Sequence, residues 1–112
     1  MATYEETKNA LEGSIYKWEQ ILARVGVDDG INNCPLCQLF DNCRGCPVDY
    51  TGHTGCSGEY SAWHYHQVSV HDSMMPHKIQ CAVCEWHAIN VINYLISLRQ
   101  TVDKMFENCA QL

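Results

Sequence analysis

Five cysteines lie close together in the first half of the chain, as two C-x2-C pairs followed by a single cysteine. They are Cys34, Cys37, Cys43, Cys46 and Cys56. A C-x2-C turn can bring two thiolates to one ion, at about 2.3 Å from a zinc. The segment around them has few large apolar side chains, and a structural zinc couples about 10–16 kcal/mol of apparent binding free energy to folding. The sequence therefore predicts a zinc site built from four of these five cysteines.

Two ligand sets suit a tetrahedral ion. The first is Cys34, Cys37, Cys43 and Cys46, and the second replaces Cys43 by Cys56. Four thiolates also bind iron–sulfur clusters. The spacing C-x2-C-x5-C is similar to that of WhiB-like iron–sulfur proteins, but the Trp-containing glycine-rich turn of that family is missing here. We predict zinc as the cofactor, with an iron–sulfur cluster as the alternative.

A third C-x2-C pair, Cys81 and Cys84, precedes the last helical segment and has three interpretations. The two thiols can pack in the core, since Cys84 falls on an apolar stripe. They can bind a second metal with His77 or His87. They can also form a redox pair, because a helix N-terminus lowers a thiol pKa. No βαβ pattern or Trp-Cys-Gly-Pro turn supports a thioredoxin-like fold.

The six histidines do not form a known catalytic pattern. The chain has neither the His-Glu-x2-His of metalloproteases nor the His-x-Glu and Pro-Cys-x2-Cys of zinc deaminases. Glu85 beside His87 is the nearest approach to such a pair. We predict that the protein is not an enzyme.

The cysteine segment resembles a group of small, cysteine-rich proteins found in tailed phages and bacteria. The resemblance runs from about Leu11 to Tyr60 and includes Lys17-Trp18-Glu19, Cys34-Pro35-Leu36-Cys37, Cys43-x2-Cys46-Pro47-Val48 and the following Cys56. It implies a metal-binding module and a phage or bacterial accessory role, without an activity. Cys81, Cys84 and the histidine-rich segment lie outside it.

Composition sets further limits. The chain has 112 residues and a net charge of −6, and its seven Lys and Arg form no basic run, which argues against nucleic-acid binding. An acidic mimic of nucleic acid stays an alternative. The N-terminus lacks a signal-peptide pattern, and no apolar run approaches the roughly 18 residues of a membrane span. We expect a cytoplasmic protein (in the host cytoplasm if it is viral), with reduced thiols.

The periodicity predicts a mainly α single domain over residues 1–112. A helix in 1–26 carries a stripe of Leu11, Ile15, Trp18, Leu22 and Val25, and a longer helix in 76–110 carries one from Cys84 to Leu112. The two form an antiparallel hairpin. Residues 31–75 form the inserted metal-binding loops, with one short β-hairpin from the alternating Tyr60–Val70 segment.

The longer C-terminal stripe leaves two interpretations open. It can complete the intramolecular hairpin alone, or it can also form a homodimer, because Val102 and Met105 extend beyond the first helix. Aromatic side chains in the middle segment suit a protein interface; they are Tyr50, Tyr60, Trp63 and Tyr65, with His53 beside them. We predict a small zinc-binding module that binds a partner protein, with an iron–sulfur or thiol redox sensor as the alternative.

Overall fold

The computed structural model describes residues 2–40, 46–50 and 58–110, and at 49, 50 and 108–110 it describes the backbone only. Its elements are α1 (Tyr4–Leu22), the 3-10 turn η1 (Gly30–Asn33), α2 (Pro35–Leu39), α3 (Pro47–Tyr50), α4 (Gly58–His71) and α5 (Ala82–Ala110). The fold is mainly α, as predicted, and the described ranges contain no strand. Cys43, Cys56 and His53 lie outside the described residues.

Helix α1 begins with a reciprocal cap. The Thr3 hydroxyl accepts from the Glu6 backbone N–H, and the Glu6 carboxylate accepts from the Thr3 N–H. Its predicted apolar stripe is buried at Leu11, Ile15 and Trp18. Val25 is instead exposed, because the helix ends at Leu22 and the chain turns away.

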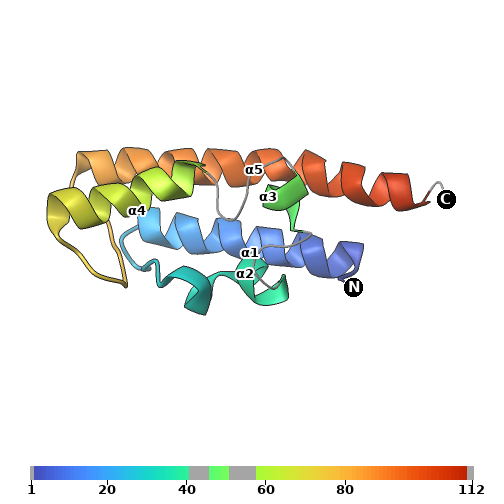
Figure 1. The fold of residues 1–112 in the computed structure, drawn as a ribbon, viewed down its shortest axis with the longest axis horizontal. Coiled ribbons are helices and arrows are strands. Elements are labelled where there is room, and N and C mark those ends of the chain that lie inside the picture. The colour runs from blue at the N-terminus through green and yellow to red at the C-terminus, as the bar shows by residue number, and fades with distance from the viewer. Residues whose placement is uncertain (1, 41–45, 51–57, 111–112) are drawn as a thin grey trace.

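Helices α1 and α5 pack antiparallel, as Figure 1 shows. Three polar contacts show this direction, because residues early in α1 meet residues late in α5, and Arg24, just after α1, meets the start of α5. They are Tyr4 Oη to Asp103 Oδ1 at 2.7 Å, Arg99 Nε to Glu12 Oε1 at 2.7 Å, and Arg24 Nη2 to Glu85 Oε2 at 2.9 Å. The antiparallel helical pair predicted from the two stripes is therefore present.

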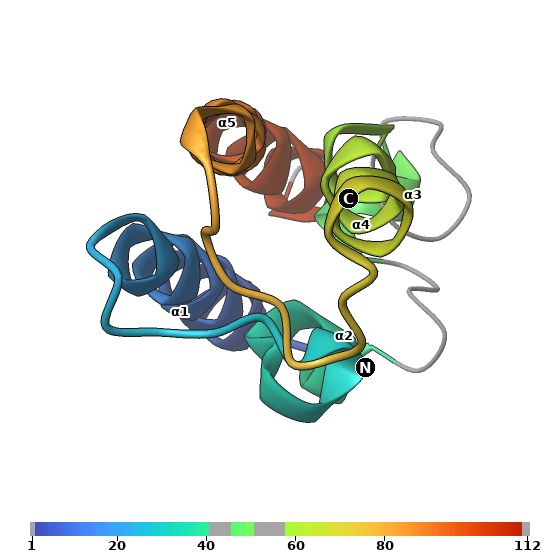
Figure 2. The same cartoon turned by 90° about the vertical axis from the view of Figure 1, so that its left-hand side faces the viewer.

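The predicted β-hairpin at Tyr60–Val70 is wrong, because this segment forms helix α4. The same segment also has a helical pattern. Trp63 and Gln67 are four residues apart, so they lie on one face of a helix, and both are fully buried. Helix α4 packs along α5 beside α1, so three helices surround the core (Figure 2). The rings of Trp18 and Trp63 meet edge-to-face, with centroids 5.1 Å apart.

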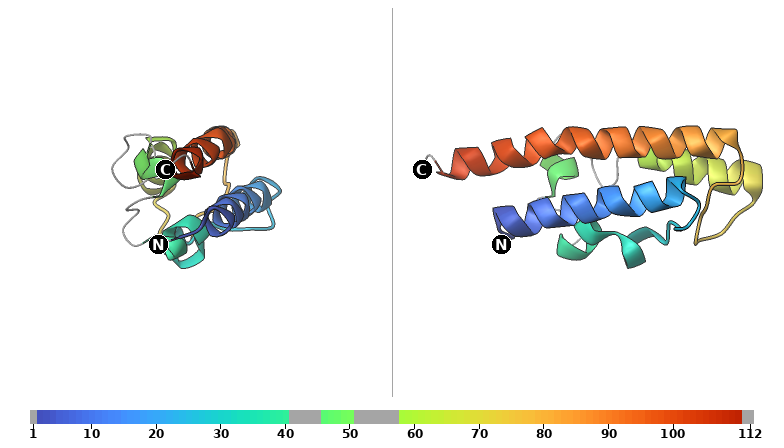
Figure 3. Two further views of the ribbon diagram at one scale, coloured as in Figure 1. Left: turned by 90° about the vertical axis from the view of Figure 1, so that its right-hand side faces the viewer. Right: turned by 180° about the vertical axis from the view of Figure 1, so that it is seen from behind.

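Helix α5 supplies the longest buried face. The predicted stripe is confirmed in the core at Cys84, Ala88, Val91, Leu95, Leu98 and Val102. The helix begins at Ala82 rather than at the predicted Pro76, because residues 72–81 form the connection from α4. Figure 3 shows this connection reaching around the end of the molecule.

One argument for a homodimer through α5 does not hold. Val102 was expected to be exposed in a monomer, but it is only 2% exposed. The start of α1 covers this part of α5, where the rings of Tyr4 and Phe106 meet edge-to-face at 5.5 Å. Met105 is half-buried. The dimer stays a prediction, without an exposed Val102 to support it.

A buried carboxylate joins the two loops that lead to the cysteine pairs. Asp28 accepts from Lys17 Nζ, from Trp63 Nε1 (both 2.9 Å) and from the Gly30 N–H at 3.0 Å. Its backbone exchanges two hydrogen bonds of 2.8 Å with that of His77. Asp28 therefore ties the loop after α1 to the loop before α5.

Candidate metal centre

Two histidines and two cysteines converge where α4 turns back into α5. His66 and His71 lie in the last turns of α4, and Cys81 and Cys84 lie at the start of α5. The two helices pack together and a nine-residue connection joins the two pairs, so the end of one helix meets the beginning of the next. The fold therefore brings together four possible metal ligands that lie within residues 66–84 of the sequence.

The donor atoms of these four side chains form a compact group. His71 Nε2 lies 3.3 Å from both Cys81 Sγ and Cys84 Sγ, and His66 Nε2 lies 3.3 Å from Cys81 Sγ. The two sulfurs are 3.6 Å apart, and all four atoms lie within 4.8 Å of one another. A tetrahedral zinc sets sulfur–nitrogen edges of about 3.5 Å and sulfur–sulfur edges of about 3.8 Å. The group can therefore hold a metal ion such as zinc.

Cys81 acts as the N-cap of α5. Its sulfur accepts from the Cys84 backbone N–H at 3.4 Å, as a Ser or Asp oxygen does at other helix starts. This N–H, followed by the His66 ring, lowers the pKa of Cys81 to about 6. The thiolate, which is the form that binds metal, is therefore already favoured near neutral pH.

Cys84 occupies a different environment although it is only three residues away. It is fully buried, and burial raises the pKa of its thiol. Gln67 Nε2 donates to its sulfur at 3.3 Å and to the Lys78 carbonyl at 2.9 Å. Gln80 in turn donates to Gln67 Oε1 at 3.1 Å, which fixes the orientation of the Gln67 amide. Outer hydrogen bonds of this kind orient metal ligands.

Cys81 and Cys84 do lie together in a possible metal site, as one of the interpretations predicted. The histidines beside them are His66 and His71 instead of the predicted His77 or His87. His77 is fully buried against Asp28, and its Nε2 lies 3.0 Å from His64 Nδ1. Burial lowers the pKa of His77. His87 lies beside His66, with ring centroids 5.2 Å apart, but it is not one of the four clustered ligands.

Sequence reasoning missed His66 and His71 as ligands. With residues 60–70 predicted as a β-hairpin, only His77 and His87 were considered as partners of Cys81 and Cys84. The available signal was the spacing His-x4-His, nine residues and then Cys-x2-Cys, which is compact enough to close around one ion.

The first cysteine pair repeats the cap geometry on α2. Cys34 is the N-cap of this helix, and its sulfur accepts from the Cys37 backbone N–H at 3.2 Å. The Cys37 thiol and this N–H lower the pKa of Cys34 to about 6. Besides the His66 group, the described part of the chain holds no cluster of three or more such ligands with equally short separations. The predicted sites that include Cys43 or Cys56 extend beyond the described residues.

Comparisons add no family to this geometry: no family model matches the chain, and neither curated proteins nor solved structures show a significant similarity. The phage or bacterial accessory role suggested by the cysteine motif therefore stays a prediction. Among the described residues, no helix combines the length and apolar character needed to cross a bilayer.

Proposed function

We propose that this protein is a zinc-stabilised helical module that binds a partner protein. The observation that supports zinc is the group of His66, His71, Cys81 and Cys84, whose donor atoms all lie within 4.8 Å of one another, several of them at separations close to those of a tetrahedral site. An ion here would join the end of α4 to the start of α5. It would add to folding free energy directly, because these ligands are not brought together in an unfolded chain.

The donor set supports a structural role for the metal rather than a catalytic one. Two imidazoles and two thiolates fill all four positions of a tetrahedral zinc, and catalytic sites keep one position for water or substrate. The neutral histidines and two thiolates also balance the charge of a divalent ion. These features favour a binding module over an enzyme.

Exposed apolar side chains on both helices next to the site support an interaction role. Tyr65 and Val70 on α4 are 73% and 63% exposed, and Trp86 on α5 is 59% exposed. Large exposed aromatic residues are typical of protein interfaces. The metal would hold α4 and α5 in a fixed relation and so fix the surface that they present.

Metal analysis of purified variants tests this proposal. Cys81→Ser and His71→Ala should each lose the equivalent of zinc held by this group and melt at a lower temperature, whereas His64→Ala, on the same helix but outside the group, should keep the zinc content of the wild type. If His71→Ala and His64→Ala retain equal zinc, the proposed ligand set is wrong. Capture of a partner should also fall in Trp86→Ser while its zinc content is unchanged.

A thiol redox pair is the second candidate, favoured by one observation. Cys81 Sγ and Cys84 Sγ lie 3.6 Å apart, and the Cys81 pKa is about 6. Two such thiols can give two electrons to a peroxide, forming one disulfide and releasing water. Rapid peroxide oxidation of the zinc-loaded protein would support this candidate. Resistance to peroxide until a chelator is added would support the structural zinc.

A further inference from the structure

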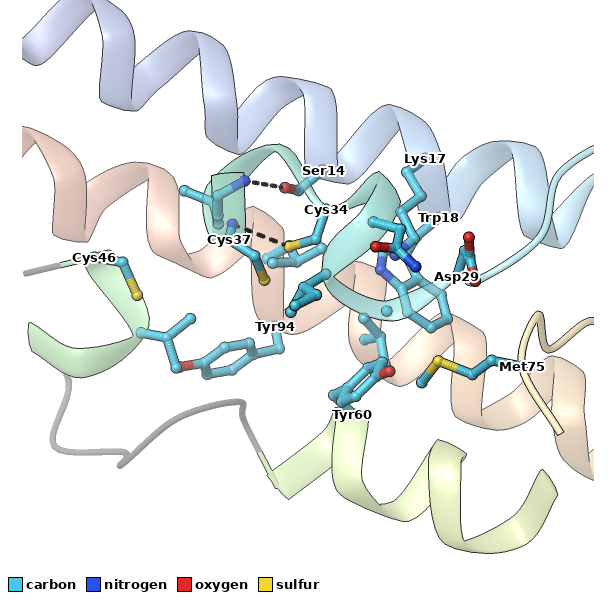
Figure 4. A pocket seen from close by; sticks show the side chains of 17 residues that line it. Ser14, Lys17, Trp18, Asp29, Cys34, Cys37, Cys46, Tyr60, Met75 and Tyr94 are labelled. Atoms are coloured by element: carbon cyan, nitrogen blue, oxygen red, sulfur yellow. Dashed lines mark hydrogen bonds between the residues drawn. The ribbon is translucent and has the colours of Figure 1, made fainter. Parts of the chain in front are cut away.

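Three cysteines, two from α2 and one from the start of α3, line one cavity that side chains of α1 and α5 also line. The cavity has a volume of about 330 Å³ and includes Cys34, Cys37 and Cys46 in its wall. Cys34 caps α2, Cys37 lies within α2, and Cys46 directly precedes α3. Figure 4 shows these side chains around the same space, with Trp18 and Met75 at its other end.

These three residues are the members that both predicted ligand sets share. The sets differ only in whether Cys43 or Cys56 is the fourth ligand. The three cysteines that both predicted ligand sets contain therefore line the same cavity. Cys46 is 2% exposed, so its thiol lies within the protein and not on an outer face.

Cys34 and Cys37 already have the local geometry of a metal-binding turn. The backbone of Cys37 donates to the sulfur of Cys34, as that of Cys84 does to Cys81 in the His66 group. Such N–H donors support the negative charge of a thiolate. Two cysteine pairs in one chain thus have the same cap, and one of them lies among two further ligands.

We propose that Cys34, Cys37 and Cys46 form a second, thiolate-rich site for a thiophilic divalent cation such as zinc. Three thiolates and one further donor complete a tetrahedral ion, and the thiol protons pass to solvent as the metal binds. Their sulfurs do not yet form a cluster as tight as the His66 group, so binding draws Cys46 toward α2 across the cavity. The site would join α2, which packs on α1, to the start of α3, which packs on α5.

The cavity wall contains one cationic and one acidic side chain, Lys17 and Asp29. Three thiolates exceed the charge of one divalent ion, and Lys17 lies in the same wall. The Lys17 ammonium favours the Cys34 thiolate, while Asp28, its ion-pair partner, opposes it. A soft, sulfur-rich donor set selects zinc and similar ions over magnesium or calcium.

Cobalt titration of the reduced, metal-free protein tests this inference. The wild type should bind two equivalents, and Cys34→Ser/Cys37→Ser should bind one. The lost equivalent should carry the stronger sulfur-to-cobalt absorption, because it has more thiolate ligands. Cys81→Ser/Cys84→Ser should lose the other equivalent, and Cys109→Ser controls for loss of a thiol elsewhere. One equivalent in the wild type that Cys34→Ser/Cys37→Ser retains would overturn the second site.

A second variant covers the case in which the double substitution fails to fold. Cys46→Ser changes one side chain beside a four-residue helix and leaves both α2 cysteines in place. It should keep the helical circular dichroism of the wild type and lose at least tenfold in affinity for the thiolate-rich equivalent. Unchanged affinity in folded Cys46→Ser contradicts the proposal, whatever happens at the His66 group. Loss confined to Cys81→Ser/Cys84→Ser would leave the proposed zinc module intact.

Discussion

Two of the three C-x2-C pairs, Cys34–Cys37 and Cys81–Cys84, have the same local structure and different surroundings. Cys34 and Cys81 each cap a helix, and each accepts the backbone N–H of the cysteine three residues on. Cys34 begins a five-residue helix, and Cys81 begins one of 29 residues. Two histidines stand next to the second pair, and they come from a helix that packs along the same long helix.

The difference shows what a short motif specifies and what the fold adds. The spacing of two cysteines sets a cap and favours a thiolate, which happens at both places. The remaining ligands depend on which other element the fold packs beside the cysteine pair. At Cys81 that element is the end of α4, joined to α5 by a short connection, so the site is close in sequence and in space.

Of the changes that test this comparison, removal of the two histidine ligands should have the largest effect on zinc affinity. His66→Ala/His71→Ala leaves Cys81 with its cap and with Cys84 beside it, but removes both nitrogen ligands. Zinc affinity at this site should fall by more than about 100-fold. Hydrogen exchange should also speed up across residues 66–81. Unchanged exchange there, with zinc lost, would mean that the metal does not hold α4 to α5.

The next largest effect should come from removing Asp28, which links the loops that lead to the two cysteine pairs. Asp28→Ala leaves Lys17 nearly buried without a counter-charge, and removal of one partner of such a pair costs about 3–5 kcal/mol of unfolding free energy. Denaturant melts of metal-loaded protein measure this cost. Because Asp28 ties both loops, the affinity of both cysteine pairs should weaken together; a change at one pair alone would contradict the shared link.

The pH dependence of this link has a definite sign. Burial by itself raises the pKa of Asp28, but Lys17 and the surrounding donors outweigh burial and hold the pKa below its usual value. The stabilising contribution is therefore present above the pKa of an unfolded aspartate, and it is lost as the pH falls through the folded value. Asp28→Asn should remove this acid-side loss from the stability profile.

A smaller change should follow from the outer ligand contact. Gln67→Leu keeps a side chain of similar size on α4 but removes the donor to Cys84 Sγ. We expect zinc affinity to fall by about 10–100-fold, with the metal still bound by four ligands. Competition with a chelator of known affinity measures the change. Gln80→Leu, one contact further out, should change affinity less.

The smallest effect concerns the two thiols of the second pair in metal-free, reduced protein. Cys81 has a pKa of about 6 and is half-buried, whereas Cys84 is fully buried with a raised pKa. Alkylation at neutral pH should modify Cys81 first, and its rate should fall as the pH drops through about 6. Mass spectrometry of digested protein reports both sites; equal rates would contradict the contrast.

Some of this structure was predictable from the sequence. The apolar stripes of α1 and α5 have clear helical periods, and they predict an antiparallel pair that is present. Helix α4 was missed because Tyr60, Trp63 and Tyr65 suit a strand by residue type, and only their burial separates the two interpretations. That error removed His66 and His71 from the list of ligands.

The position of Cys46 was not predictable in the same way. Its place in the wall of the cavity depends on where α3 packs against α5, and α3 has only four residues and no periodicity of its own. The pairing of Asp28 with Lys17 and Trp63 likewise joins positions that are distant in sequence. Such contacts come from the assembled core and not from a local pattern.

X-ray absorption at the zinc edge of Cys34→Ser/Cys37→Ser tests the central claim most directly, because this variant leaves only the His66 group intact. The account predicts one zinc per chain, with two sulfur neighbours at about 2.3 Å and two nitrogen neighbours at about 2.0–2.1 Å. Four sulfur neighbours, or no bound zinc in a folded variant, would contradict a metal centre made by His66, His71, Cys81 and Cys84.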